Sequence, residues 1–297
     1  MDEPEFYVRQ GVSFLEVTEV QREAAFEMLG AALSAKGLQL TRDIMRLNLT
    51  LAELTDDNFD EYGEWQYYIT VMGAPSATEP WGLQLDGHHA IINYFVLGDQ
   101  VVATLFFAGS EPVAATFGKY QGTSILQDET TQGLALINGF DESHRRKAVL
   151  EPVKTGDKNV TESWRDNVVI DYAGIPVMEM SDTELRRLVG LIELYVGNLA
   201  DGHAGVKMKE VLAHMDRTYF AWIGGTDAGN AFYYRIQSPV IIIEFDHQRP
   251  IGMRHLLNPN MPTTEHVHTV VRTPNGNDYG KDLLRQHYER QHASAGR

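Results

Sequence analysis

The 297-residue sequence contains no cysteine, and this absence excludes several kinds of chemistry. Without thiols the chain forms no disulfide bond, no cysteine-ligated zinc or iron–sulfur site and no thiol nucleophile. Positive charge is also scarce, because 25 Lys and Arg stand against 41 Asp and Glu, for a formal net charge of −16. A field of that sign repels phosphate backbones and anionic lipid surfaces. We therefore expect neither a nucleic-acid partner nor a membrane partner.

Targeting signals and common catalytic motifs are lacking as well. The chain begins Met-Asp-Glu-Pro-Glu, without the positive start and apolar stretch of a signal peptide, so we expect a cytoplasmic protein. There is no Gly-x-Ser-x-Gly elbow, no His-Glu-x-x-His helix and no phosphate loop ending in Gly-Lys-Ser/Thr. The glycine-rich stretch 224–229 lies between two strand-like runs, which predicts a hairpin turn. From Glu289 the sequence is a polar tail, 289–297.

Helical periodicity comes first, and strand-like patterns follow it. Apolar residues recur at helical spacing over Thr18–Lys36, with Gly37 predicted as the C-terminal cap, and a second helix follows from Thr41 to about Thr55. The Asp86-Gly87 pair separates two strand-like runs and is a strong hairpin signal. The predicted strands are Gln66–Met72, Trp81–Leu85, His88–Val96 and Val101–Phe107.

The same order recurs in the second half of the chain. Two more helices are predicted at Ser124–Asn138 and Asp141–Ala148, and the polar stretch 151–170 is predicted to be a surface excursion or a lid. The elements that repeat the first pattern are helices at Ser181–Leu199 and Val206–Arg217 and strands at Tyr219–Ile223, Phe232–Ile236, Val240–Asp246 and His266–Arg272.

These patterns predict an α+β fold in a single domain, 1–297, built of two αα-ββββ pseudo-repeats at approximately 15–150 and 175–290. The two antiparallel sheets are expected to form a central crevice with the helices packed outside. Two meanders that merely look alike are the alternative to a duplication.

Two histidines on one strand are the first candidates for a metal site. His266 and His268 lie in the run Glu-His-Val-His-Thr-Val-Val-Arg-Thr. Because strand side chains alternate between faces, both imidazoles point the same way, and their nitrogens can reach one metal ion. The alternative is a pair of solvated or hydrogen-bonded histidines on an edge strand.

Glu244 is the next candidate, because it lies inside the most apolar strand of the chain, Val-Ile-Ile-Ile-Glu-Phe-Asp. Burying a carboxylate costs free energy unless a partner compensates it. We expect that partner to be a metal, Arg235 or Arg272, or a retained proton. Asp246 shares the strand face and is either a further oxygen ligand or the polar end of the strand.

A third histidine is expected from the start of another strand. His88 and His89 follow the Asp86-Gly87 turn, and neighbouring rings in a strand face opposite sides, so at most one of them joins a given site. We predict that His89 faces inward, on the face of Asn93. His88 is the alternative if a bulge follows the turn.

Five stretches together carry a family likeness: Trp-Gly-Leu-Gln-Leu-Asp-Gly-His-His (81–89), Phe-Tyr-Tyr-Arg-Ile-Gln-Ser-Pro (232–239), Ile-Ile-Glu-Phe-Asp (242–246), His-Val-His-Thr-Val-Val-Arg-Thr-Pro (266–274) and Asn-Asp-Tyr-Gly (277–280). They span most of the chain and resemble a bacterial and fungal family known as the domain of unknown function 3500. The resemblance implies no activity. It implies that the family's signature stretches include His89, Arg235, Glu244, His266, His268, Arg272 and Asp278.

We therefore expect a metal-dependent enzyme that acts on a small organic substrate. An all-histidine and carboxylate set suits a divalent ion of zinc, iron, copper or manganese. Hydrolysis is slightly favoured, with a carboxylate as general base. The expected metal ligands are His89, His266, His268 and Glu244, with His88 in reserve.

The arginines are expected to orient an anionic group of the substrate by bidentate hydrogen bonds. The expected catalytic residues are Glu244, Arg235, Arg272 and Asp278. Two alternatives stand beside hydrolysis. One is an iron- or copper-dependent oxidoreductase at the same site. The other is a metal-free binding or structural protein with a polar network between its sheets.

Overall fold

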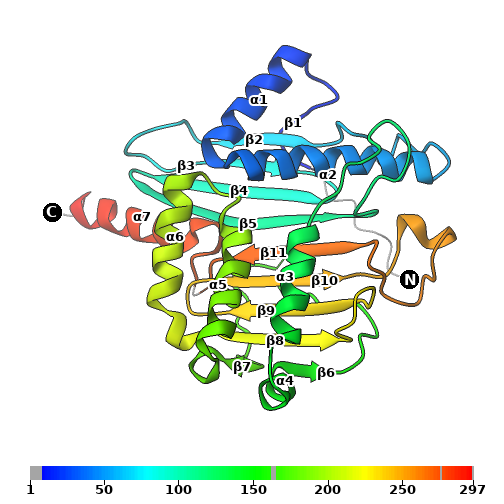
Figure 1. Ribbon diagram of the computed structural model, residues 1–297. Coiled ribbons are helices and arrows are strands. Elements are labelled where there is room, and N and C mark those ends of the chain that lie inside the picture. The colour runs from blue at the N-terminus through cyan, green and yellow to red at the C-terminus, as the bar shows by residue number, and fades with distance from the viewer. Residues whose placement is uncertain (1–8, 162–164, 275, 296–297) are drawn as a thin grey trace.

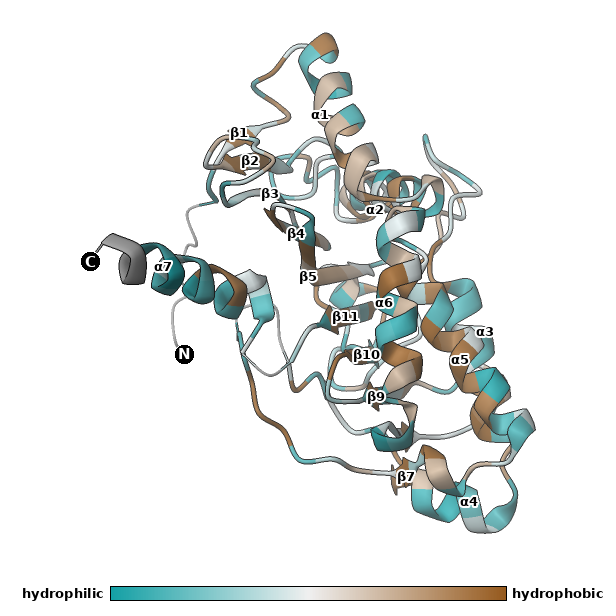
Figure 2. Ribbon diagram, turned by 90° about the vertical axis from the view of Figure 1, so that its left-hand side faces the viewer, coloured by the Kyte–Doolittle hydropathy of each residue, from teal (hydrophilic) through white to brown (hydrophobic). Residues whose placement is uncertain are grey.

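One sheet, mostly antiparallel, runs through the whole protein, and most of the helices lie against one of its faces (Figures 1 and 2). The structure is a computed structural model, and it describes residues 9–161, 165–274 and 276–295. The strands follow in space the order β1-β2-β3-β4-β5-β11-β10-β9-β8-β6, and β7 pairs with β8. This arrangement confirms the predicted α+β class.

The strands of the first half are β1 (Val12–Ser13), β2 (Tyr68–Met72), β3 (Trp81–Asp86), β4 (Ala90–Leu97) and β5 (Gln100–Ser110). Those of the second half are β6 (Val149–Glu151), β7 (Ile175–Pro176), β8 (Tyr219–Gly224), β9 (Phe232–Gln237), β10 (Ile242–His247) and β11 (Val267–Arg272). The strands predicted from the sequence overlap β2 to β5 and β8 to β11, because their β-branched and aromatic runs were bounded by clear turn residues.

The two meanders join edge to edge, and this corrects the expectation of two sheets around a central crevice. β5 and β11 pair antiparallel, from Val267 opposite Ser110 to Val271 opposite Phe106. Each meander alone would leave the outer edge of its last strand unpaired. Pairing β11 with the second half of β5, from Phe106 to Ser110, covers that part of both edges and produces one open sheet.

The helices are α1 (Glu19–Ala32), α2 (Ala35–Leu54), α3 (Gln127–Asn138), α4 (Glu142–Ala148), α5 (Asp182–Val196), α6 (Asp201–Ala213) and α7 (Lys281–Ala295). Figure 2 shows α2, α3, α5 and α6 on one side of the sheet and α7 on the other. The stretch from Glu289 to Ala295, predicted as a polar tail, belongs to α7. No helix in the described part of the chain is both long enough and apolar enough to cross a bilayer.

Gly37 does not end the first helix, which corrects another expectation. α1 stops before Leu33, and the Ser34 hydroxyl accepts the N–H of Gly37 at 3.1 Å, which caps α2. A Cβ atom at Gly37 would lie 2.1 Å from the carbonyl oxygen of Asn198. Glycine therefore serves a close approach of α2 to the α5–α6 connection, and that contact has no local sequence signal.

The two faces of the sheet differ in chemistry because side chains alternate along each strand. The face under the helices is apolar, and Trp222, Tyr234, Ile243 and Phe245 are fully buried in it. The opposite face of β9, β10 and β11 carries buried polar groups. These are Tyr233, Arg235, Glu244, Asp246 and Arg272.

The segment 152–161 covers part of this polar face. It belongs to the stretch 151–170 that was predicted to be a surface excursion or a lid, of which 162–164 lie outside the described residues, and buried contacts hold it against the sheet. Its main-chain N–H groups donate to the two carboxylates of β10, Glu244 and Asp246. The donors are those of Lys158, Asn159, Val160 and Thr161.

The order of the strands is the one that an internal duplication would produce. Read inward from each side of the sheet, the strand order is β2-β3-β4-β5 in the first half and β8-β9-β10-β11 in the second. The last strands of the two halves, β5 and β11, therefore meet in the middle. The α1–α2 and α5–α6 connections also meet, through a bridge between Leu33 and Leu199. The duplication itself stays a prediction.

Candidate metal centre

Three histidine rings from distant parts of the chain meet on the polar face of the sheet. The Nε2 atom of His266 lies 3.3 Å from Nε2 of His89 and 3.0 Å from Nε2 of His268. One ligand nitrogen from each ring lies within 4.8 Å of the others. The structure thus brings His89 to the His-x-His pair, as the sequence predicted.

Gly109 makes room for this convergence. It lies on β5, between the strands that carry the histidines, and stands opposite His268 in the register of β5 and β11. A Cβ atom at this position would lie 3.1 Å from Cδ2 of His268 and 3.3 Å from Cδ2 of His89. The two rings can therefore close over β5 because Gly109 has no side chain.

The orientation of His266 is fixed by the main chain. Its Nδ1 atom lies 2.7 Å from the carbonyl oxygen of Arg249. Because a carbonyl only accepts hydrogen bonds, Nδ1 carries the hydrogen and donates, and Nε2 keeps its lone pair. Histidines that bind metals in proteins almost always donate their other N–H to a carbonyl or carboxylate in this way.

Glu111 fixes the main chain next to this contact. Its buried carboxylate accepts the main-chain N–H groups of Ile251, Gly252 and Met253 at 2.9 to 3.2 Å, which fixes the turn that follows Arg249. One of its oxygens also lies 3.8 Å from Nδ1 of His266. No local pattern points to Glu111, because its partners are about 140 residues away along the chain.

His88 lies beside the three rings. Its ring centroid is 4.0 Å from that of His89, and its Nδ1 donates to Oδ1 of Asn48 at 2.8 Å. Asn48 in turn donates from Nδ2 to the carbonyl oxygen of Gly63. His89 is therefore the member of the pair that faces the His-x-His residues, while His88 packs against it.

Burial keeps these imidazoles neutral. Desolvation lowers the pKa of His89 and of His268 well below the ordinary 6.5. It also lowers the pKa of His266, although the Glu111 carboxylate opposes the effect. The pKa of His88 is lowered to about 4 by the same cause. Neutral imidazole is the form that binds metal ions.

Glu244 does not join the histidines, and this corrects the metal role predicted for it. The side chain is fully buried, and its Oε1 accepts the Tyr233 hydroxyl at 2.6 Å and the Val160 N–H at 2.8 Å. Its Oε2 accepts both the main-chain N–H and the hydroxyl of Thr161. Hydrogen bonds, rather than a metal ion, satisfy this carboxylate.

Asp246 is opposite His268 across β10 and β11, but its carboxylate is also engaged. It forms an ion pair of 2.6 Å with Lys154, and both side chains are buried. Desolvation raises the pKa of Asp246 to about 7, against the lowering effect of the Lys154 ammonium. Burial likewise lowers the pKa of Lys154. We interpret this pair as a structural contact that fastens the segment 152–161.

The other predicted catalytic residues are held in structural contacts. Arg272 and Asp278 form a buried ion pair of 2.7 Å, and Arg272 donates from Nε to the carbonyl oxygen of Thr161. Arg272 also lies four residues beyond His268, roughly 13 Å along the strand. Arg235 donates to the carbonyl oxygen of Asp171 at 3.0 Å. The geometry thus leaves the three histidines as the predicted residues that converge.

Comparison with known proteins gives one match. No curated protein and no solved structure matches the chain. The family model described as protein of unknown function DUF3500 matches residues 2–281, which include all the residues of the histidine centre. Since this match covers nearly all of the 297 residues, the chain belongs to the DUF3500 family.

Proposed function

We propose that this protein is a metal-dependent enzyme whose divalent ion is bound by the Nε2 atoms of His89, His266 and His268. The observation that carries the proposal is the convergence of these three nitrogens. Two nitrogens that bind one tetrahedral zinc ion at about 2.0–2.1 Å lie roughly 3.3 Å apart. The distances of 3.3 and 3.0 Å in the cluster fit that spacing.

The hydrogen-bonding capacity of His266 favours a cation over a purely polar network. Its Nδ1 hydrogen is given to Arg249, so Nε2 offers a single lone pair. Two imidazole nitrogens, those of His89 and His268, lie within hydrogen-bond distance of it. One lone pair accepts one hydrogen bond well, so one of the two contacts is left unsatisfied. A cation accepts all three lone pairs at once.

The ligand set restricts the metal and the type of site. Imidazoles without a carboxylate suit zinc, copper or iron better than magnesium or calcium. Three protein ligands leave one coordination position open, as in catalytic zinc sites. His89 and His266 are buried, whereas His268 is partly exposed. We therefore expect a substrate to approach past His268.

Hydrolysis of a small organic substrate is the reaction that we favour. Held by His89, His266 and His268, a zinc ion would supply an activated water molecule and would polarise a carbonyl group. Around it, Arg249 and Glu111 hold His266 in one orientation, and the ring of Phe107, 4.9 Å from that of His268, shields the centre on the β5 side. The Glu111 carboxylate lies 3.8 Å from Nδ1 of His266, and its engagement with main-chain N–H groups makes it a poor general base.

Oxidation with copper or iron is the second candidate, because three imidazoles also suit copper. The identity of the bound metal distinguishes oxidation from hydrolysis. An iron site of two histidines and one carboxylate would need a carboxylate ligand, and the oxygens of Glu244 are occupied.

The test begins with protein purified without an affinity tag and analysed for metal content. We expect close to one zinc, copper or iron ion per chain, lost in the double variant His266→Ala/His268→Ala and kept in the control His287→Ala. Zinc-loaded protein should hydrolyse members of a panel of small esters and amides, and a chelator should remove that activity. Metal-free protein with no thermal stabilisation by added zinc, copper, iron or manganese would refute the proposal.

A further inference from the structure

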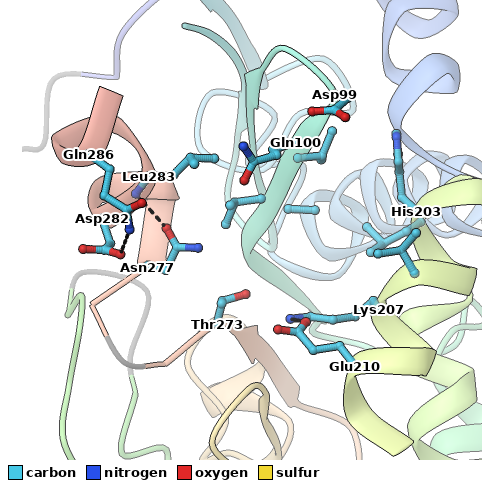
Figure 3. A pocket seen from close by; sticks show the side chains of 15 residues that line it. Asp99, Gln100, His203, Lys207, Glu210, Thr273, Asn277, Asp282, Leu283 and Gln286 are labelled. Carbon is cyan, nitrogen blue, oxygen red and sulfur yellow. Dashed lines mark hydrogen bonds and ion pairs between the residues drawn. The ribbon is translucent and has the colours of Figure 1, made fainter. Parts of the chain in front are cut away.

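A slot opens in the middle of the sheet where β5 runs past the end of β11 (Figure 3). β5 pairs with β4 down to Gln100, which stands opposite Leu97. On its other side, the pairing with β11 reaches only to Phe106, opposite Val271. Within the described parts of the chain, the first residues of β5, 100–103, therefore have a strand neighbour on one side only.

A cavity of about 390 Å³ occupies this slot. The consecutive residues 99–103 all line it. Successive side chains of a strand point to opposite faces, so a cavity that all of them line must lie along the edge of the strand. Alternate main-chain N–H and C=O groups point outward from such an edge. The open stretch, 100–103, is roughly 13 Å long, which is enough to pair with about four residues of another chain.

The slot has a helix on each side of the sheet. α6 lies on one side and the start of α7 on the other, and Thr273, directly after β11, closes one end (Figure 3). An extended segment in the slot would therefore continue the line of β11. The residues that α6 and α7 contribute include Val206, Lys207, Glu210, Asp282, Leu283 and Gln286.

Negative charge prevails around the slot. The carboxylates of Asp99, Glu210 and Asp282 line the slot together with one ammonium group, that of Lys207, and Asp282 is paired with Arg285 outside the lining. That ammonium group is engaged, because it donates to Glu210 at 2.8 Å and to the carbonyl oxygen of Val240 at 2.9 Å. Together with the net charge of −16, this arrangement attracts a cationic ligand.

We propose that the slot binds an extended, positively charged peptide of about four residues, which pairs with β5 as an added strand. In this mode of recognition, main-chain hydrogen bonds supply affinity and pockets for alternate side chains supply specificity. Side chains on one face of the peptide meet α6, and those on the other meet α7. A lysine, an arginine or an amino terminus then lies near Asp99. The site is separate from the histidine centre, because Gly109 is six residues, roughly 20 Å, beyond Ala103 along β5.

The binding test uses fluorescein-labelled Val-Lys-Val-Lys amide, titrated with the full chain and followed by fluorescence anisotropy. Val206→Trp should fill the slot and weaken binding at least tenfold. The matched control Leu212→Trp, on the same helix but away from the slot, should bind as the wild type does. Asp99→Lys should weaken binding of this peptide and improve binding of Val-Glu-Val-Glu amide.

Hydrogen exchange tests the strand pairing itself. In the free protein, the amides of 101–103 that point into the slot should exchange faster than those of 106–109, and the lysine peptide should slow them at least tenfold. A peptide N-methylated at alternate residues should neither bind nor protect. Equal binding by that peptide, binding unaffected by Val206→Trp, or binding of spermine as tight as that of the lysine peptide would each overturn the proposal.

Discussion

His266 donates from Nδ1 to the carbonyl oxygen of Arg249 at 2.7 Å, and this contact decides which nitrogen of the ring faces His89 and His268. The turn that follows Arg249 is held by the Glu111 carboxylate. The centre therefore depends on residues that bind no metal themselves, and this dependence can be measured.

Replacing Glu111 by Ala should weaken both the fold and the metal centre. It leaves three main-chain N–H groups, one buried and two partly buried, without their acceptor, at about 1–3 kcal/mol for a buried group, so we expect a loss of about 3 kcal/mol in unfolding free energy. The loosened His266 should lower zinc affinity about 10- to 100-fold. Urea unfolding and a competitive zinc titration check both effects. Glu16→Ala, an exposed control, should change neither, and an unaltered zinc affinity in Glu111→Ala would show that the turn is irrelevant to the centre.

Glu244→Gln separates the ligand role predicted for this residue from the structural role observed. The glutamine amide group places a donor where the carboxylate now accepts from Tyr233 and Thr161, so the unfolding free energy should fall by about 2 kcal/mol. The metal content should stay at the wild-type level, because Glu244 is not among the converging groups. Loss of the metal from a folded Glu244→Gln protein would restore Glu244 as a ligand.

Gly109→Ala should disturb the spacing of the rings. The added methyl group would press on Cδ2 of both His89 and His268 and lie 2.4 Å from the carbonyl oxygen of Val267. We expect about 2 kcal/mol of destabilisation and at least tenfold weaker zinc binding. Copper(II) substitution followed by electron paramagnetic resonance should show an altered ligand field. Gly205→Ala, in open space on α6, is the control and should stabilise the helix by up to about 1 kcal/mol.

Replacing Lys154 should lower the unfolding free energy, because the buried carboxylate of Asp246 then lacks a cation. Lys154→Met leaves Asp246 without its cation, and breaking a buried pair in this way costs about 3–5 kcal/mol. The double variant Lys154→Met/Asp246→Asn should recover much of this loss, because the second change removes the unpaired charge. The unfolding free energies of both single variants and the double variant complete the cycle. Equal stability of Lys154→Met and the wild type would mean that the pair carries little energy.

Acid should destabilise the fold partly through His247. Burial lowers its pKa to about 3, and its Nδ1 lies 3.0 Å from the main-chain nitrogen of Phe232, from which it accepts a hydrogen bond. Between that value and the unfolded pKa of about 6.5, the unfolded chain binds the extra proton, so stability falls as the pH falls.

His247→Asn keeps an acceptor for Phe232 and removes the titration. Between pH 7 and pH 5, its unfolding free energy should therefore fall by about 2 kcal/mol less than that of the wild type. Guanidinium unfolding at both pH values measures the difference. Parallel losses in the two proteins would mean that other groups account for the acid sensitivity.

The elements of the fold were well predicted from local patterns, but their assembly was not. The strands β8 to β10 carry strong apolar alternation and clear turns, and their limits agree with the prediction within about two residues. The joining of β5 to β11 depends on two edges more than 150 residues apart in the chain, and no local pattern encodes it. Gly37 illustrates the same limit, because its role depends on Asn198.

The histidine site followed from strand parity, whereas the roles of the charged residues did not. Parity places His266 and His268 on one face and selects His89 over His88, and the geometry agrees. Glu244 was correctly expected to be buried, but a sequence cannot show that the N–H groups of Val160 and Thr161 reach it. Burial alone indicates that a partner exists and does not say which.

The junction between β5 and β11 also divides the histidines. His89 belongs to the first half of the sheet, and His266 and His268 belong to the second, so no fragment cut between the halves contains the full set. An ion held by all three rings would add its binding free energy to the cohesion of the two halves. Occupancy of the centre would then report that the whole sheet has assembled, and chelation should loosen the halves from each other before it melts either one.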